Sequence, residues 1–181
     1  MALLKTVRIG LFLCLFPLFA SNARAVLAGT ADCPGGALVL AAAASFQKAA
    51  AVGTPQAFAS ALVRHAPVSN LALQALGPYR KNLQAKRQAE FQKNALAFMG
   101  RFVAENAAGL RGANLKVVAC RGNLIESTAN GRKVIWRVSG SQVLDVKVSG
   151  FSLSVQMRNK FVRVISQNNG DVGALIDFLG R

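Results

Sequence analysis

The hydrophobic pattern of this chain changes its period at Gly112, and this change restricts the possible folds more than any other feature. Beyond Gly112, short segments rich in branched residues alternate between apolar and polar positions, as the strands of a half-buried sheet do. Each segment is separated from the next by two residues suited to a hairpin turn. The pattern predicts about four antiparallel strands at 115–120, 123–128, 133–138 and 143–149, with turns at Arg121-Gly122, Asn130-Gly131 and Gly140-Ser141.

One face of this predicted sheet is apolar and needs a cover. On that face we expect, from the third and fourth strands, Val134, Trp136, Val138, Leu144, Val146 and Val148. Asp145 and Lys147 are expected on the opposite face. Helices predicted on both sides of the sheet in the sequence can supply the cover, so the expected fold class is α+β.

The segments before the sheet favour helices. An alanine-rich run at 37–51 ends at Gly53, and Thr54-Pro55 supplies an N-cap and a first-turn proline for a second helix through about residue 64. Ser69 or Asn70 can cap a short third helix that ends near Gly77-Pro78.

A helix at about 85–106 has the clearest amphipathic pattern. Phe91, Ala95, Phe98 and Phe102 recur at spacings of four, three and four along one face. Both an ordinary core and the wall of a ligand cavity are compatible with such a face. After the sheet, helices are expected at about 152–167 and 171–179, with Asp171 as the N-cap of the last one.

The first 25 residues have the three-part layout of a secretory signal peptide. A basic start at Lys5 and Arg8 precedes an apolar run at 9–20, and the motif Ala23-Arg24-Ala25 follows. A membrane anchor is the alternative, but the run is well short of the roughly 20 residues that span a bilayer. We therefore expect cleavage after Ala25, export to the periplasm and a mature chain of one domain, residues 26–181.

The expected mature chain is strongly basic. Three of the 22 Lys and Arg residues lie in the signal peptide, so 19 basic residues face seven acidic ones and the net charge is +12. This charge favours anionic partners such as membrane surfaces and phospholipid headgroups, and no nucleic acid is expected outside the cytoplasm. The densest basic cluster, interpreted as the solvated face of a helix, is Arg80, Lys81, Lys86, Arg87 and Lys93.

Two cysteines remain in the mature chain, Cys33 and Cys120. In an oxidising compartment an isolated pair most simply forms one disulfide, and two unpaired buried thiols are the alternative. No His or Cys lies near either of them in the sequence to complete a metal site.

Residues typical of catalytic centres are scarce. His65 is the single histidine, and its place at a helix end predicts a capping or solvated side chain. The acidic residues are scattered, and the sequence has no phosphate-binding loop, nucleophile elbow or thiol redox motif. We therefore expect no catalytic residue, metal or cofactor, although folding could still bring an acid/base pair together.

A longer motif occupies the C-terminal third. Its residues are Asp145-Val146-Lys147-Val148-Ser149-Gly150-Phe151-Ser152-Leu153, then Arg158 and Phe161, then Asn169-Gly170-Asp171 with Leu175-Ile176. Together with the strand Val134-Ile135-Trp136-Arg137-Val138 and the phenylalanine-bearing helix, this pattern resembles the MlaC-like periplasmic phospholipid-binding proteins, also called the toluene-tolerance family. The resemblance covers about residues 40–179. Ser141, Leu144, Ser149 and Met157 depart from the family's usual residues, so the chain resembles a divergent member.

The resemblance implies a helical layer packed on a curved antiparallel sheet, enclosing an apolar pocket for a phospholipid or another apolar lipid. It also implies a carrier that moves lipid between the outer and inner membranes, with transient membrane contact. Its partners would be an outer-membrane lipoprotein complex and an inner-membrane ABC transporter complex. Arg158 would be a headgroup or docking residue. The expected pocket residues are Phe91, Phe98, Met99, Phe102, Trp136, Val138, Val146, Val148, Phe151 and Phe161.

Two other classes of function are compatible with the sequence. An exported, non-catalytic adaptor would have the same fold without a cavity, and its basic face would dock on a membrane or a partner protein. An enzyme would need titratable groups that converge inside a cavity. The size and lining of any cavity therefore separate the three classes.

Overall fold

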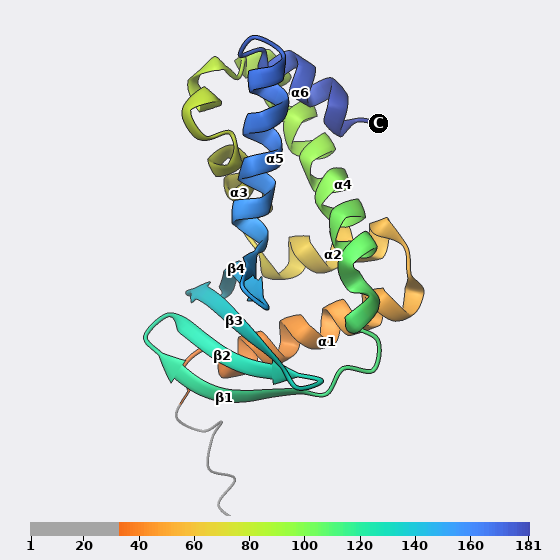
Figure 1. Ribbon diagram of the computed structural model, residues 1–181, viewed down its shortest axis with the longest axis vertical. Helices are drawn as coiled ribbons and strands as arrows, with labels where there is room; N and C mark the ends of the chain where they lie inside the picture. Colours follow the sequence, from red (N-terminus) through yellow and green to blue (C-terminus); the bar gives the residue numbers. More distant parts are fainter. Residues whose placement is uncertain (1–32) are drawn as a thin grey trace, which may run out of the picture.

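The computed structural model describes residues 33–181, and the expected signal peptide, residues 1–25, lies outside the described part. Four helices precede the sheet and two follow it (Figure 1). The helices are α1 (Gly36–Val52), α2 (Pro55–His65), α3 (Val68–Ala75), α4 (Gln88–Asn106), α5 (Leu153–Gln167) and α6 (Val172–Leu179). The strands are β1 (Leu115–Arg121), β2 (Leu124–Ala129), β3 (Arg132–Ser139), β4 (Gln142–Val148) and β5 (Phe151–Ser152). The α+β class is therefore confirmed.

The sheet is an antiparallel meander in which the strands pair in chain order. Both Asn130 and Gly131 have positive φ, 50° and 75°, as an Asn-Gly hairpin turn requires. The first turn lies at Gly122-Asn123, one residue later than predicted, because Arg121 still pairs with Leu124. The fifth strand has two residues, which is too short to produce a period-two signal.

A bulge in the sheet changes which side chains share its apolar face. Val138 pairs with Val143 while its neighbour Arg137 pairs with Asp145, so Leu144 is the extra residue of β4. The prediction that Leu144 shares a face with Val146 was therefore wrong, and Val143 is the buried residue at this position. Alternation alone does not reveal such an insertion.

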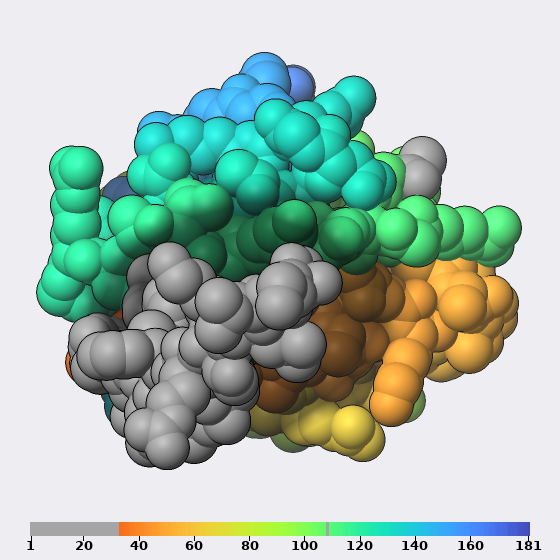
Figure 2. Space-filling view, turned by 90° about the horizontal axis from the view of Figure 1, so that it is seen from below, coloured from red at the N-terminus to blue at the C-terminus, as the bar shows by residue number. Residues whose placement is uncertain are grey.

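The apolar face of the sheet is covered by α1. Val39, Ala42 and Ala43 of α1 are buried against it, together with Trp136 and Val138 of β3. In the view from below, the orange-brown surface of α1 lies along the green surface of β1 (Figure 2).

The indole of Trp136 keeps its polar atom satisfied within this core. Its Nε1 donates a 2.8 Å hydrogen bond to Oγ of Ser127, a residue that is itself fully buried. A buried N–H without such a partner would destabilise the core.

Side chains from α2 to α6 form a second core, which we call the helical body, and a smaller third cluster around Phe58 packs α2 against α1. Its largest fully buried side chains include Phe91, Met99, Phe161 and Leu175. Three of its helices have side-chain N-caps: Thr54 for α2, Ser152 for α5 and Asp171 for α6. The caps at Thr54 and Asp171 are confirmed.

Two boundaries of the helical body differ from the prediction. The segment Ala85–Arg87 is a 3-10 turn, and α4 begins after it at Gln88. The helix α3 begins at Val68 and its N-cap position is Pro67, so the prediction of a cap at Ser69 or Asn70 was wrong. Pro67 ends the preceding extended segment and leaves both polar residues inside the first turn.

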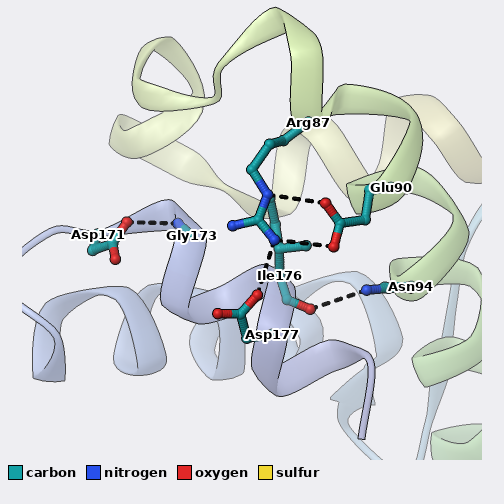
Figure 3. Close-up of polar contacts among 7 residues, drawn as sticks. All are labelled: Arg87, Glu90, Asn94, Asp171, Gly173, Ile176 and Asp177. Carbon is teal, nitrogen blue, oxygen red and sulfur yellow. Dashed lines mark hydrogen bonds and ion pairs between the residues drawn. The ribbon is translucent and has the colours of Figure 1, made fainter.

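Polar contacts hold α6 against α4 (Figure 3). The guanidinium of Arg87 contacts both Glu90 and Asp177 at 2.9 Å, and Asn94 Nδ2 donates to the carbonyl oxygen of Ile176 at 3.1 Å. The hydrogen bond from Arg87 lowers the pKa of Glu90, and the bonds to Glu90 and Asp177 raise the pKa of Arg87. The basic cluster was interpreted as the solvated face of a helix. For Arg87 that interpretation is corrected, because its side chain forms ion pairs with Glu90 and Asp177.

The two cysteines form a disulfide. Their Cα atoms are 5.6 Å apart, and the bond joins the segment before α1 to β1 across 87 residues of sequence. Of the two alternatives that the sequence left open, the paired form is therefore the correct one.

Replacing Cys33 and Cys120 together with serine should lower the free energy of unfolding by about 4 to 5 kcal/mol, because a cross-link over so long a loop restricts the unfolded chain. Urea denaturation of the oxidised wild type and of the double variant measures this difference. Equal midpoints and slopes for the two proteins would contradict the expectation.

The helices α2 and α4 cross at Gly100. A Cβ added there would lie 2.5 Å from the carbonyl oxygen of Pro55 and 3.1 Å from Cβ of Ala59. Gly100→Ala should therefore destabilise the protein by about 1 to 3 kcal/mol, although alanine is the better helix former. Gly109→Ala is the matched control, since nothing lies within 4 Å of a Cβ at that position. Thermal unfolding compares them, and equal melting temperatures would rule out the close crossing.

Candidate functional site

The ten apolar candidates from the sequence occupy three different places in the structure. Phe91, Met99 and Phe161 are fully buried in the helical body. The half-buried ring of Phe98 packs against them, with its centroid 5.9 Å from that of Phe161. The three candidates on α4 therefore come together with Phe161 of α5, which is far from them in sequence.

Phe102 extends the same group of rings toward the surface. It stacks on Phe98 with the ring centroids 6.2 Å apart, and Phe98 also lies 6.1 Å from Phe178 of α6. Lys160 Nζ is 5.1 Å from the centroid of the Phe178 ring, within the range of a cation–π contact. The aromatic group thus links α4, α5 and α6.

A second set of candidates belongs to the core between the sheet and α1. Trp136 and Val138 are buried there, and Val146 is half-buried against them. This core shares no buried side chain with the helical body. The two form separate apolar bodies within the described residues.

Three half-buried side chains lie on elements that join the two bodies, because β4 contacts both α1 and α5, and we call these three residues the core boundary. Phe46 of α1 and Leu153 of α5 pack on the helical body, whereas Val146 of β4 packs on the sheet core. Sequence analysis did not single out Phe46, and it named Leu153 only as part of the C-terminal motif. The signal for Phe46 is its position as the one aromatic residue within the alanine-rich run of α1.

Val148 and Phe151, the last two apolar candidates, belong to neither core. They lie at the edge of the sheet with 39% and 70% of their surfaces exposed. Arg158 is exposed on α5, where its guanidinium lies over the backbone of Gly77. The structure therefore does not bring these three residues together with the buried candidates.

A shallow polar pocket of about 210 Å³ lies between α3 and the sheet. Its wall includes Asn70 and Gln74 from α3, and Arg137, Gln142 and Leu144 from β3 and β4. Pockets for drug-sized ligands begin at about 300 Å³ and are mostly apolar, so this one has the wrong size and lining for acyl chains.

His65 is buried, which corrects the prediction of a capping or solvated side chain. A 2.8 Å hydrogen bond joins its Nε2 to Oγ of Ser45 on α1. Burial, assisted by the neighbouring charge of Arg64, lowers the pKa of His65 below its usual value of 6.5. The packing of α2 against α1 brings the ring into the interior. This contact is tertiary, so the local sequence around His65 does not predict it.

Asp145 has a structural role that the sequence motif did not explain. Its carboxylate accepts a 2.6 Å hydrogen bond from Ser152 Oγ and a 2.9 Å bond from the backbone N–H of Ser154. It thereby anchors the first turn of α5 to β4. Within residues 33–181, no three His, Cys, Asp or Glu residues gather closely enough to hold a metal ion.

Taken together, the architecture is an α+β domain with a five-stranded meander, one helix over its apolar face and a helical body beside it. The same fold occurs in a phospholipid-binding protein from Ralstonia solanacearum, whose structure was solved in complex with a phospholipid. The two chains superpose with a TM-score of 0.62 at 24% sequence identity, covering 79% of this chain and 90% of that one. The α+β fold implied by the sequence resemblance is thus confirmed, while the enclosed apolar pocket stays a prediction.

No protein-family model matches this sequence, and no curated protein matches it either. No helix in the described part of the chain is long and apolar enough to cross a bilayer.

The buried His65 predicts a pH dependence of stability. Because its pKa is lowered in the folded state, the unfolded chain binds more protons just below pH 6.5, so the free energy of unfolding should fall as the pH drops from 7.5 to about 5.5. Urea midpoints at the two pH values measure the change, and His65→Gln should reduce it. An equal pH dependence in the wild type and the variant would exclude His65 as the cause.

Proposed function

We propose that this protein is a periplasmic carrier of a phospholipid or related apolar lipid, acting as residues 26–181 after removal of a signal peptide. The observation that carries the proposal is the fold shared with a protein solved with phospholipid bound, over 90% of that protein's length. The scattered titratable groups support binding rather than catalysis.

The acyl chains would lie at the core boundary. Each methylene transferred from water to an apolar surrounding contributes about 0.8 kcal/mol, so the lipid needs a dry surface along its whole length. The helical body and the sheet core are both apolar and share no buried side chain. Acyl chains that enter between the helical body and the sheet core would move these two bodies apart, and the packing inside each body would be kept.

The half-buried Val146 is assigned to contact with the acyl chains at the core boundary, with Phe46 and Leu153 added from the structure. The other buried and half-buried candidates are assigned to the two apolar bodies on either side of this site. Arg158 is assigned to headgroup or docking contacts, since its charge is exposed at the surface of α5. The assigned candidates from the sequence are Phe91, Phe98, Met99, Phe102, Trp136, Val138, Val146 and Phe161.

The transport step is part of the same proposal. A carrier that covers the acyl chains of its lipid can cross the aqueous space between two membranes. By the resemblance described above, it would exchange lipid with an outer-membrane lipoprotein complex and an inner-membrane ABC transporter complex. The net charge of +12 would assist transient contact with anionic membranes.

A second candidate function is a non-catalytic adaptor that docks through its basic surface and carries no lipid. The observation in its favour is the small, polar character of the pocket beside α3. A carrier would contain bound lipid and an adaptor would not, so the lipid content of the purified protein distinguishes the two functions.

Mass spectrometry of an organic extract from the mature protein, purified from the periplasm without detergent, should find about one lipid per protein. Val146→Trp, which fills the core boundary, should reduce this load about tenfold. Val63→Trp is the matched control, because Val63 is 58% exposed on α2. A lipid-free wild-type protein would reject the carrier, and an undiminished load in a folded Val146→Trp variant would reject the proposed location.

A further inference from the structure

An exposed apolar group lies at the end of the sheet where β4 turns into β5. Phe151 is 70% exposed, the largest fraction among the exposed large apolar residues in the described part of the chain, and Val148 and Val155 are 39% and 51% exposed. Val148 and Phe151 pair across the two strands, and Val155 lies in the first turn of α5. We call these three residues the turn patch.

The turn patch is held at the tip of a tight hairpin. Ser149 and Gly150, which connect β4 to β5, both have positive φ, 49° and 92°. Phe151 follows directly after them, and the Ser152 side chain is held by Asp145. The hairpin therefore presents the phenyl ring to solvent from a constrained backbone.

Basic side chains surround this end of the sheet. The N–H of Ser149 donates to the carbonyl oxygen of Lys133, which brings the β4–β5 turn next to the start of β3. Arg132, Lys133 and Lys147 are all exposed there. Lys116 is exposed at the corresponding end of β1, since Leu115 pairs with Ala129 next to the β2–β3 turn.

Among the described residues, acidic side chains neutralise Lys133 but leave the rest of this basic group unpaired. Among the carboxylates of the described residues, Glu126 pairs with Lys133 at 2.6 Å, while Asp145 is engaged with Ser152 and Ser154. Lys116, Arg132 and Lys147 make no salt bridge within residues 33–181. The end of the sheet thus combines an exposed aromatic tip with a net positive charge.

We propose that this end of the sheet docks on the surface of an anionic phospholipid bilayer. The Phe151 ring would enter the boundary between headgroups and acyl chains, and Lys116, Arg132 and Lys147 would contact phosphate groups. Apolar insertion beside basic residues is the combination that binds proteins to anionic interfaces, and the charge of the patch is complementary to such a surface.

Docking in this orientation places the core boundary beside the membrane. Val146 precedes Val148 by two residues on the same face of β4, and Leu153 follows Phe151 by two residues at the start of α5. A lipid that leaves the bilayer at the turn patch would therefore reach the proposed acyl-chain site without crossing open water. The role of docking in lipid transfer rests on the proposed function, whereas docking itself does not require that the protein bind a lipid.

Cosedimentation of the mature protein with vesicles tests the proposal. Binding should be clear with equal parts of phosphatidylglycerol and phosphatidylcholine, weak with phosphatidylcholine alone, and reduced when salt rises from about 0.1 to about 1 M. Phe151→Ser should weaken partitioning roughly tenfold. Exchanging Lys116 and Lys147 for glutamine should weaken it about fivefold for each charge removed.

Matched variants elsewhere on the surface serve as controls. Val52→Ser removes a valine that is 65% exposed at the end of α1, and the Lys86→Gln, Lys93→Gln pair removes two exposed charges from another basic cluster. Both should bind vesicles like the wild type, and thermal melts verify that each variant is folded. If the control pair weakens binding as much as the patch pair, the attraction is a general effect of charge and the proposal fails.

The remaining outcomes separate docking from cargo binding. A protein that purifies without lipid but still requires Phe151 for vesicle binding would reject the carrier and retain the docking surface. A Phe151→Ser variant that loses its lipid yet still binds vesicles would place the ring in the cargo site and overturn the docking proposal. A wild type that binds no vesicle would overturn it as well, and would make the turn patch a protein contact instead.

Discussion

The attachment of α1 to the apolar face of the sheet is the contact on which the rest of the fold depends. Alanine side chains let a helix lie close to a sheet, but each buries little area, and α1 has a single charged residue, Lys48. A disulfide at one end of α1 and hydrogen bonds near the other end supplement this weak packing. The disulfide holds the segment before α1, while Gln47 donates to the carbonyl oxygen of Ala113 and Arg111 Nε donates to that of Ala50 near its other end. Phe46 can then reach the helical body from a helix whose position is already determined.

Most of the secondary structure follows from local rules that the sequence displays. The Asn130-Gly131 turn, the Thr54 cap and the Asp171 cap each depend on residues within a few positions of one another, and all three were predicted. The bulge at Leu144 depends instead on how β3 and β4 fit together, so no local pattern reports it. The burial of His65 has the same origin, because the partner that accommodates it lies 20 residues away on α1.

The candidate site is less visible in the sequence than the fold. Phe161 and Phe151 are both phenylalanines in the recognised C-terminal motif, yet one is fully buried and the other is 70% exposed. Periodicity cannot separate them, because the two-residue strand β5 sits between a turn and a helix and has no period of its own. For the same reason, the sequence could propose a list of apolar side chains but could not divide them among two cores and a surface patch.

The order of the elements along the chain also affects how the molecule is made. During synthesis, α1 emerges well before the strands that will cover it, because 87 residues separate Cys33 from its partner on β1. The four main strands are local hairpins that can form quickly once they are available, whereas the contact between α1 and the sheet has to wait for them. A nascent chain therefore carries the alanine-rich apolar segment of α1 without the sheet until residues 115–148 have been made. Factors that shield such segments should determine the yield of this protein more than the intrinsic speed at which its sheet folds.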